Sequence, residues 1–428
     1  MNVESTIEIK PVRELDAVVR VPGSKSYTNR ALITAALADG KSTIKNALFS
    51  DDTQYMATAL NKLGISIEEH LKENAFVVHG LGGHFPVKEA KLFVGNAGTA
   101  MRFLTALLTL AKGTYEIDGV ERMRNRPVQD LIDCLNRLGA DVSSKYNNGC
   151  PPVLIKPKVL VGGRTKMKGN LSSQYFSAIL LTAPYSRTST QLTVIGDLVS
   201  KPYIDMTINL MNQFGVEVEN MLYKEFLISA NQKYKAIEYE VEADASSASY
   251  FLAAAAIAGG RVRVEGLNKD SLQGDVRIAD ILEQMGCIVS SDDHWIEIQG
   301  GELRGIDVDL KDTPDIAQTL AAVAVFADGK TRVRNVRTLR IKETDRISGV
   351  VTEMQKLGVT VKEFEDGFEI ERSEPKPGII ETYGDHRMAM SFSLIGLRTG
   401  GIKIKDPGCV SKTFPSFFEE LGRLKALR

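Results

Sequence analysis

The 428-residue sequence has little of the chemistry that would tie it to a metal, a redox reaction or an oxidising compartment. Its four cysteines stand at positions 134, 150, 287 and 409, and no two of them form a C-x-x-C pair. This spacing argues against a zinc site, a redox motif and a disulfide framework. Four of the five histidines, at positions 70, 79, 84 and 294, belong to no recognisable constellation. We therefore expect no metal and no other cofactor, and a reducing, cytoplasmic location.

Long hydrophobic runs and an excess of one charge are also missing. The longest apolar stretch, around residues 250–258, is far shorter than a membrane span, and the opening MNVESTIEIK lacks the apolar core of a secretory signal. With 53 Lys and Arg against 54 Asp and Glu, the formal net charge is −1. The basic residues are not interleaved with aromatic ones. We therefore expect a soluble protein that binds neither membranes nor nucleic acid.

What the sequence does contain is a repeat with a period of about 70 residues. A helical run that ends in glycine and continues with alternating apolar residues occurs as ALNKLGISIEE, CLNRLGADVSS, LMNQFGVEVEN, ILEQMGCIVSS and EMQKLGVTVKE. The glycines are Gly64, Gly139, Gly215, Gly286 and Gly358, which stand 71 to 76 residues apart. Each copy predicts an amphipathic outer helix that stops at a C′ glycine, followed by a half-buried strand.

A second pattern with the same period lies between these copies. It is a polar turn followed by a small-residue, almost wholly apolar helix, and its copies begin SKSYTNRALITAALADG, GNAGTAMRFLTALL, SSQYFSAILLTAP, DASSASYFLAAAAIAGG, TPDIAQTLAAVAVFADG and GDHRMAMSFSLIGL. A helix that is apolar on nearly all sides is buried. Chance similarity is the alternative, and two independent patterns with one period argue against it.

Six units in 428 residues predict an α/β protein with two domains of three units each. The first domain would comprise residues 23–241, and the second would comprise residues 1–22 with residues 242–428. The sixth unit lacks a closing strand, which the segment TIEIK at residues 6–10 can supply. The chain would then cross between the domains twice.

Cationic residues recur at the starts of the predicted helices, where capping alone would not place them. Helix N-termini bind anions readily, and capping calls for Ser, Thr, Asp or Asn. Lysine and arginine oppose the helix dipole there, so their recurrence indicates ligands with several negative charges. These cations are Lys25, Arg30, Arg102, Arg126, Lys342, Arg346, Arg387 and Lys412. Each motif alone could be a solvated, salt-bridged first turn, but their shared position in the repeat favours a common anion site.

Taken in order, these motifs resemble those of the 5-enolpyruvylshikimate 3-phosphate synthase family. The stretches that carry the resemblance are PGSKSYTNRALITAALADG, LFVGNAGTAMRFL, ERMRNRPVQDLID, GNLSSQYFSAILLTAP, LVSKPYIDMTINLMNQFGVEVEN, EADASSASYFLAAAAIAGG, RIKETDRI, YGDHRMAMSFSL and SKTFPSFFEEL. The resemblance implies a two-domain inside-out α/β barrel with three β-α-β-α-β-β units per domain. It also implies transfer of the enolpyruvyl group of phosphoenolpyruvate to the 5-hydroxyl of shikimate 3-phosphate, a glyphosate-sensitive step of chorismate and aromatic amino-acid biosynthesis.

The resemblance also distributes the polar residues between the two substrates. Shikimate 3-phosphate would contact Ser26, Arg30, Ser172, Ser173, Gln174, Ser200, Tyr203, Asp315, Lys342 and the position of Thr338. Phosphoenolpyruvate would contact Lys25, Gly98, Arg126, Gln174, Arg346, Arg387 and Lys412. The catalytic group would be Asp315 as proton acceptor, Glu343 as proton donor, and Lys25. Shikimate 3-phosphate would lie on the side of the first domain, while the acid, the base and a cation cluster would come from the second.

Three positions bear on how closely the chain follows its relatives. Many relatives carry Asn where this chain has Thr338, and many read R-P-L where it has Arg102-Phe103-Leu104. Thr338 therefore puts one contact with the sugar-like ring in question, and Phe103 could shift the following helix. Gly98 is followed by Thr99, as in glyphosate-sensitive members, and we expect sensitivity.

Two other functions deserve comparison. The sister family, UDP-N-acetylglucosamine enolpyruvyl transferase, shares the fold but carries a cysteine in the loop that here reads GVERMRNRPV. A non-catalytic binding protein on the same scaffold would not need both Asp315 and Glu343. We expect a monomer. Because the candidate residues come from both halves, we also expect the domains to close on shikimate 3-phosphate, whose anionic groups would bridge cations on both sides. Small-angle scattering should then show a smaller radius of gyration with this ligand.

Overall fold

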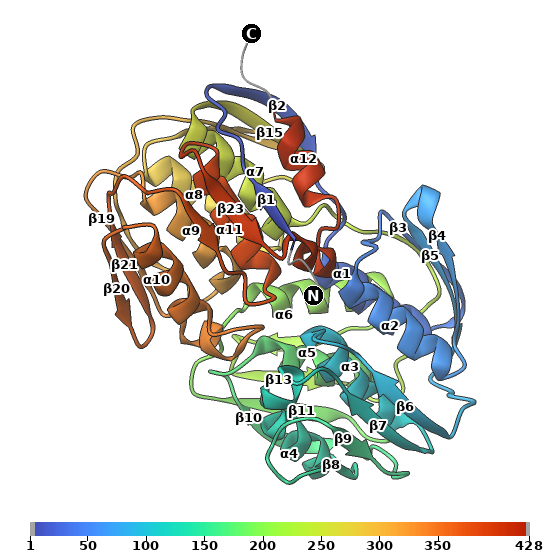
Figure 1. Cartoon of the computed structure of the whole chain (residues 1–428). Helices are drawn as coiled ribbons and strands as arrows, with labels where there is room; N and C mark the ends of the chain where they lie inside the picture. The colour runs from blue at the N-terminus through green and yellow to red at the C-terminus, as the bar shows by residue number, and fades with distance from the viewer. Residues whose placement is uncertain (1–4, 425–428) are drawn as a thin grey trace. The chain divides into compact units, whose positions relative to one another are not determined.

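A computed structural model describes residues 5–424 of the chain (Figure 1). The chain divides into two compact units. Residues 23–242 form one of them, the continuous unit, and residues 1–22 together with residues 243–428 form the other, the split unit. The expected boundary placed residue 242 with the split unit, whereas Glu242 belongs to the continuous one. Residues 1–4 and 425–428 of the expected second domain lie outside the described part of the chain.

The continuous unit contains three four-stranded sheets, each with one parallel and two antiparallel pairings. Their strand orders are β14 (Glu238–Glu240), β3 (Asp39–Lys45), β5 (Ala75–Leu81), β4 (Ser66–His70); β6 (Glu89–Phe93), β7 (Thr114–Asp118), β9 (Val153–Ile155), β8 (Val142–Ser144); and β10 (Gly163–Lys168), β11 (Thr190–Ile195), β13 (Glu225–Ile228), β12 (Glu219–Met221). The repetition of one strand order shows that three copies of one supersecondary unit build this half of the chain.

The split unit repeats the same plan. Its sheets run β16 (Ile288–Ser291), β17 (Trp295–Gln299), β15 (Gly260–Glu265), β2 (Leu15–Arg20); β18 (Asp307–Asp309), β19 (Lys330–Arg334), β21 (Gly367–Glu371), β20 (Val361–Phe364); and β1 (Thr6–Glu8), β23 (Ile402–Lys405), β22 (Gly378–Ile380). The prediction that TIEIK completes the sixth unit is confirmed, because β1 pairs antiparallel with β23 and Thr6 lies opposite Lys405.

Two strands lie just before the points at which the chain passes from one unit to the other. Strand β2 pairs in parallel with β15, so the segment before the first crossing stays in the split unit. Strand β14 pairs in parallel with β3, so the segment before the second crossing completes the first sheet of the continuous unit. Each unit is therefore closed by a strand that is remote in sequence from the rest of its sheet.

The helices follow the two patterns predicted from the sequence. The buried helices are α1 (Lys25–Leu37), α3 (Gly98–Leu107), α5 (Ser173–Thr182), α7 (Ala245–Ala258), α9 (Ala317–Ala324) and α11 (His386–Gly396). Every residue of α3 and α11 is buried. The outer helices are α2 (Asp51–Lys62), α4 (Gln129–Arg137), α6 (Pro202–Gln213), α8 (Ile278–Gln284), α10 (Arg346–Lys356) and α12 (Phe417–Arg423). In α4 only Leu131, Ile132, Cys134 and Leu135 are buried, as expected of an amphipathic helix.

The repeated glycines end five of the outer helices. Gly64, Gly139, Gly215, Gly286 and Gly358 have φ values between +76° and +110°, a conformation that side chains with a Cβ rarely adopt. Each follows the C-cap residue of its helix, and the chain turns directly into the next strand. The predicted C′ glycines are confirmed, and they account for the period of the repeat.

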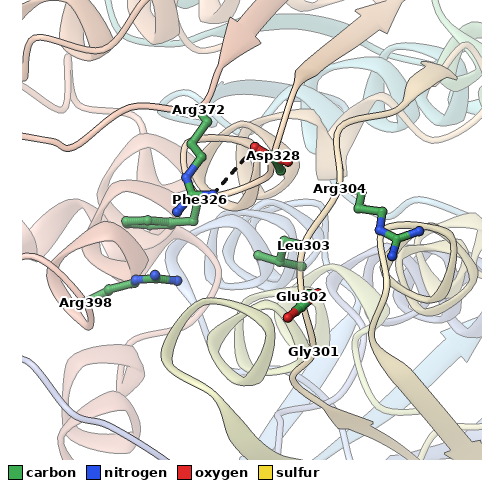
Figure 2. Close-up of a pocket in the computed structure, with 8 residues that line it drawn as sticks. All are labelled: Gly301, Glu302, Leu303, Arg304, Phe326, Asp328, Arg372 and Arg398. Atoms are coloured by element: carbon green, nitrogen blue, oxygen red, sulfur yellow. Dashed lines mark ion pairs between the residues drawn. The ribbon is translucent and has the colours of Figure 1, made fainter.

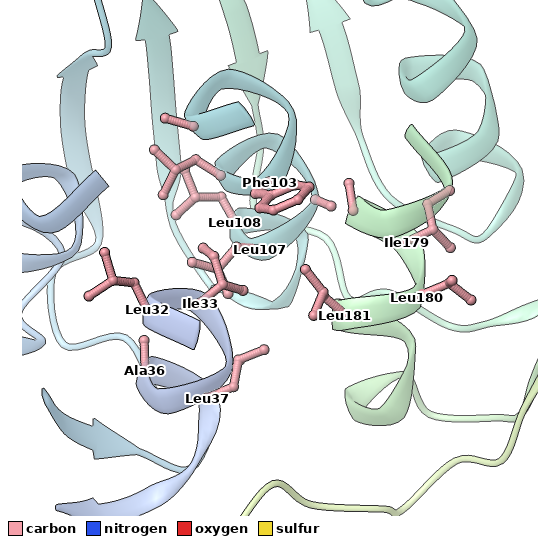
Figure 3. Packing of buried hydrophobic residues seen from close by; sticks show 14 of the residues in the cluster. Leu32, Ile33, Ala36, Leu37, Phe103, Leu107, Leu108, Ile179, Leu180 and Leu181 are labelled. Carbon is pink, nitrogen blue, oxygen red and sulfur yellow. The ribbon is translucent and has the colours of Figure 1, made fainter. Parts of the chain in front are cut away.

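Each unit has its own hydrophobic core around its three buried helices. In the continuous unit, side chains of α1, α3 and α5 point toward one another, among them Ile33, Phe103 and Leu181 (Figure 3). Phe103 is 1% exposed, so it is an ordinary member of this core. The helices are thereby fixed side by side, which holds their N-terminal ends together.

The described residues carry neither a membrane-spanning helix nor a ready metal site. Between residues 5 and 424, every helix is too short or too polar to cross a bilayer. In the same range, no three His, Cys, Asp or Glu side chains are grouped so that they could hold a metal ion. All four cysteines are free thiols.

Candidate functional site

Two groups of polar side chains stand at the N-terminal ends of helices, one group in each unit. In the continuous unit, α1 begins after Ser24, whose side chain accepts a hydrogen bond from the N–H of Tyr27. Lys25, the first residue of α1, forms an ion pair of 3.2 Å with Asp52 in the first turn of α2. Asp52 is 2% exposed, so this lysine is held at a defined position by a buried carboxylate.

Arg30 is the most enclosed cation of the continuous unit, with 1% of its surface exposed. Its guanidinium donates to Thr207 Oγ1 at 2.8 Å, to Ser177 Oγ at 3.2 Å, and to the carbonyl oxygens of Ser26 and Tyr203. It also lies over the ring of Phe103, 5.3 Å from the ring centroid. Burial lowers the pKa of Arg30 to about 10, which leaves it charged at neutral pH. Arg30 thus ties α1 to α5 and α6 while it brings a positive charge to the helix ends.

A tight cradle forms where α3 begins. Arg126 donates to the carbonyl and side-chain oxygens of Asn96 at 3.0 and 3.1 Å, and Arg102 donates to the carbonyl of Gly98 at 3.0 Å. A Cβ added at Gly98 would lie 2.6 Å from a nitrogen of each arginine. Only glycine therefore fits between the two guanidinium groups without displacing them.

The other residues of this unit that were predicted from the sequence to contact substrate lie around the starts of α5 and α6. Ser172 is the N-cap of α5, where it accepts from the N–H of Gln174, and Gln174 reaches Thr99 of α3 at 3.3 Å. Ser200 has φ +56° and is buried, and Tyr203 lies beside the guanidinium of Arg30. Hydrogen bonds thus connect the starts of α3 and α5, and Arg30 connects α1 with α5 and α6.

Arg346 is the hub of the group in the split unit. It is 2% exposed and binds three carboxylates from three different elements: Asp385 at 2.7 Å, Glu343 at 2.8 Å and Asp315 at 3.1 Å. Burial alone would lower the pKa of Arg346, but these three charges outweigh burial and raise it. The arginine is therefore permanently charged, and it fixes the two carboxylates that were selected as base and acid.

Lys412 and the residues directly before α10 also belong to the group around Arg346. Lys412, at the end of the short helix η8 (Pro407–Lys412), lies 3.9 Å from Glu343 and is 7% exposed. Lys342 caps η7 (Arg337–Ile341), directly before Glu343. Thr338 lies half-buried within η7.

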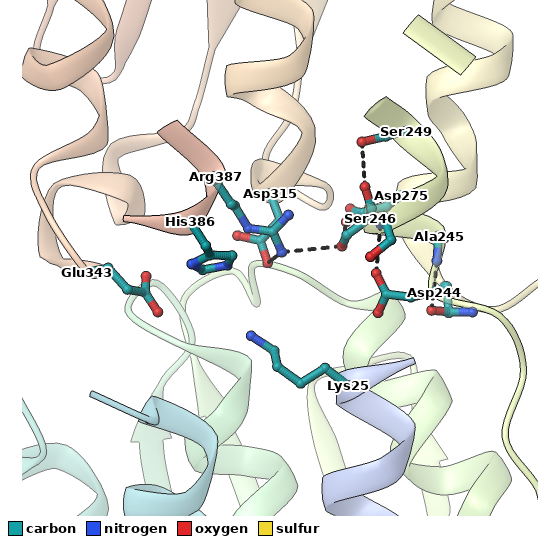
Figure 4. Close-up of polar contacts among 12 residues, drawn as sticks. Lys25, Asp244, Ala245, Ser246, Ser249, Asp275, Asp315, Glu343, His386 and Arg387 are labelled. Carbon is teal, nitrogen blue, oxygen red and sulfur yellow. Dashed lines mark hydrogen bonds and ion pairs between the residues drawn. The ribbon is translucent and has the colours of Figure 1, made fainter. Parts of the chain in front are cut away.

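Arg387 connects Asp315 with the start of α7 (Figure 4). Its guanidinium pairs with Asp315 at 3.2 Å and donates to Tyr250 Oη at 3.2 Å and to Ser246 Oγ at 3.3 Å. The hydroxyl of Ser246 in turn donates to the buried carboxylate of Asp275. Burial in the first place, and the charge of Asp315 in the second, raise the pKa of Asp275 to about 7.

Sequence reasoning selected the cations but assigned no role to three carboxylates that position them. Asp52 holds Lys25, Asp385 holds Arg346, and Asp275 is linked to Arg387 through Ser246. All three stand at helix starts, where Asp is an ordinary capping residue. Asp385 is indeed the N-cap of α11, which accepts the N–H of Arg387, so the sequence offered no signal of its second role.

A cavity of about 440 Å³ lies elsewhere in the split unit (Figure 2). It is lined by Gly301, Glu302, Leu303, Arg304, Phe326, Asp328, Arg372 and Arg398. None of these residues belongs to the groups described above. The cavity and the polar residues at the helix starts are therefore separate features of this unit.

Comparison with known proteins identifies a single family. The family model described as EPSP synthase (3-phosphoshikimate 1-carboxyvinyltransferase) matches residues 9–421. A curated 3-phosphoshikimate 1-carboxyvinyltransferase of Nostoc sp. is 50% identical over 95% of this chain and 96% of its own length. One from Marinomonas sp. is 47% identical over 97% and 98%. The solved EPSP synthase of Acinetobacter baumannii superposes with a TM-score of 0.84, at 28% identity and 98% coverage of both chains.

Proposed function

The chain belongs to the EPSP synthase family, and we propose that its two groups of polar side chains divide the work of the reaction that defines this family. That reaction transfers the enolpyruvyl group of phosphoenolpyruvate to the 5-hydroxyl of shikimate 3-phosphate and releases phosphate. It is a step of aromatic amino-acid biosynthesis. Both substrates carry a phosphate and a carboxylate, so the enzyme must bring several negative charges together, and this needs many cations.

Shikimate 3-phosphate would be held mainly by the continuous unit. The proposed contacts are Ser26, Arg30, Ser172, Ser173, Gln174, Ser200 and Tyr203, with Asp315, Thr338 and Lys342 from the split unit. What supports this assignment is the network around Arg30, whose guanidinium is fixed by four hydrogen bonds and so loses little further freedom on binding a phosphate.

Phosphoenolpyruvate would be held by cations of both units, namely Lys25, Arg126, Arg346, Arg387 and Lys412, together with Gly98 and Gln174. The cradle at the start of α3 supports this assignment. There Gly98 leaves room beside Arg126, and the helix N-terminus adds its own positive end.

Asp315 and Glu343 would be the base and the acid of the reaction. Asp315 would accept the proton of the 5-hydroxyl as its oxygen attacks the central carbon of phosphoenolpyruvate, and Glu343 would give a proton to the methylene carbon. The Glu343 carboxylate would then take a proton back from that carbon as phosphate leaves, which would restore the double bond. Lys25 would stabilise negative charge on the transferred group. The observation that carries the proposal is that one guanidinium, that of Arg346, binds both carboxylates, at 3.1 and 2.8 Å.

The roles of the two carboxylates can be tested with isosteric variants. D315N and E343Q should each lower kcat by at least about a hundredfold, since general acid–base groups contribute about 10²–10⁴-fold. Binding of shikimate 3-phosphate, measured by calorimetry, should weaken much less in E343Q than kcat falls. The matched control is E302Q, because Glu302 is an exposed carboxylate of the same unit outside the group. A kcat above a tenth of the wild-type value in either variant would rule out its assigned role.

We also propose that the enzyme works as a monomer in the cytoplasm and is inhibited by glyphosate in competition with phosphoenolpyruvate. The Gly98–Thr99 pair at the start of α3 supports the last point, because the cradle there takes no larger residue than glycine without moving Arg126. An inhibition constant in the millimolar range would count against it. Sedimentation of the purified protein tests the monomer.

A further inference from the structure

Asp275 is a buried carboxyl group whose bonding is incomplete. It lies in η5 (Gly274–Arg277), directly before α8, and is 3% exposed. Its Oδ2 accepts a hydrogen bond from Ser246, whereas its Oδ1, in the described part of the chain, has no hydrogen-bond partner. A buried carboxylate is costly unless both of its oxygens are satisfied, so the site favours the neutral acid.

Asp275 reaches the proposed active-site residues through a chain of contacts. Ser246 donates to Asp275 and accepts from Nη2 of Arg387 at 3.3 Å, and the same Nη2 lies 3.2 Å from Oδ2 of Asp315 (Figure 4). The guanidinium of Arg387 is thus shared between Asp315 on one side and the Ser246–Asp275 pair on the other. A change in the charge of Asp275 must alter this balance.

The charged groups that face Asp275 come from three elements. Asp244, the N-cap of α7, and Asp315 in η6 (Pro314–Ile316) disfavour its negative charge, while Arg387 of α11 and the hydroxyl of Ser246 favour it. Burial outweighs them all, and the pKa of Asp275 is raised to about 7. The carboxyl group therefore changes its charge within the range in which enzymes of this kind are assayed.

We propose that Asp275 is a positioning residue for phosphoenolpyruvate: in its neutral form it leaves Arg387 to the substrate, and in its ionised form it draws the guanidinium back through Ser246. This rests on the proposed function, in which Arg387 binds phosphoenolpyruvate. Asp275 itself touches no substrate. Its ionisation adds a negative charge near an anion site, so it opposes binding more than it opposes the chemical step.

The test compares wild type with D275N, in which the side chain is permanently neutral. The KM for phosphoenolpyruvate is measured between pH 5.5 and 9, and the wild-type value is divided by the variant's at each pH, which cancels every titration common to both. The ratio should be constant below about pH 6 and rise by about three- to tenfold above pH 8, since one charge is added at short range. The corresponding ratio of kcat values should change much less.

The control is D280N, because Asp280 is an exposed carboxylate in α8 and its ratio should stay flat. A KM ratio for D275N that does not vary with pH would overturn the proposal.

A second variant tests the same link should D275N fail to fold. S246A removes the only hydrogen bond that the described structure gives to Asp275, together with the hydroxyl that links Asp275 to Arg387, so the rise in KM should become smaller and move to higher pH than in wild type. An unshifted rise would overturn the inference. R387M separates the inference from the proposed function. An unchanged KM for phosphoenolpyruvate in R387M would remove the role of Arg387, whereas a raised KM together with a flat D275N ratio would remove only the role of Asp275.

Discussion

Replacing Arg346 with methionine should destabilise the split unit by about 3–5 kcal/mol, which is the typical cost of removing one partner from a buried ion pair. Methionine has a similar length but no charge, and the carboxylates of Asp315, Glu343 and Asp385 would lose their common partner. Glu343 would still lie near Lys412, and Asp315 would still pair with Arg387. We therefore expect the cost of breaking one ion pair rather than three. Asp385, with no exposed surface, is the carboxylate most affected.

The single tryptophan, excited selectively over the tyrosines, allows this loss to be measured in the split unit. The chain has one tryptophan, Trp295 in β17, so its fluorescence follows the unfolding of the split unit alone. Urea unfolding of R346M should give a smaller free energy of unfolding than wild type by the stated amount. In thermal unfolding the midpoint should fall by roughly 10 °C, at about 2–4 °C per kcal/mol for a unit of this size.

The matched control for this variant is R304M. Arg304 is an exposed arginine of the same unit that forms no ion pair with the described residues, and surface changes of this kind usually cost less than about 0.5 kcal/mol. If R346M lost less than about 1 kcal/mol, or no more than R304M, the role of Arg346 as the electrostatic hub of this unit would be refuted.

Two further predictions follow from the buried site residues. G98A should raise the KM for phosphoenolpyruvate by about tenfold or more. The new Cβ would lie 2.6 Å from a nitrogen of Arg126 and of Arg102, and weakening one charge-assisted hydrogen bond costs about 1.5–3 kcal/mol. An unchanged KM in steady-state kinetics would contradict this prediction. D275N should become more stable relative to wild type as pH rises. Because the pKa of Asp275 is raised to about 7, the folded wild type binds more protons than its unfolded chain between about pH 4 and 7. The free energy of unfolding of wild type therefore falls by up to about 4 kcal/mol as pH rises across that window. A difference in the free energy of unfolding between D275N and wild type, measured in urea, that does not change with pH would speak against this.

The repeat could be read from the sequence because its signals are local. A C′ glycine such as Gly64 or Gly358 ends its helix through its own φ, and an almost wholly apolar run such as that of α7 is expected to be buried. Neither inference needs a distant partner. The completion of the sixth unit by β1 was also predictable, because a missing strand and an unused one were the only two pieces left over.

The ion-pair network could not be read in the same way, since it depends on residues far apart in the chain. Arg346 and Asp385 are separated by 39 positions, and Asp385 carries an ordinary N-cap signal that conceals its contact with the guanidinium. Arg30 was predicted as a substrate-binding cation, but nothing local indicated that Ser177 and Thr207 would also bind it. Asp275 shows the same limit, because its burial arises from the packing of α7 and η5.

The most direct test of the account is phosphate release from phosphoenolpyruvate by the purified protein, with D315A as the control. One reaction contains shikimate 3-phosphate and the other UDP-N-acetylglucosamine. The account predicts release only with shikimate 3-phosphate, and loss of that release by at least about a hundredfold in D315A. Release with the nucleotide sugar instead, or undiminished release by D315A, would contradict it.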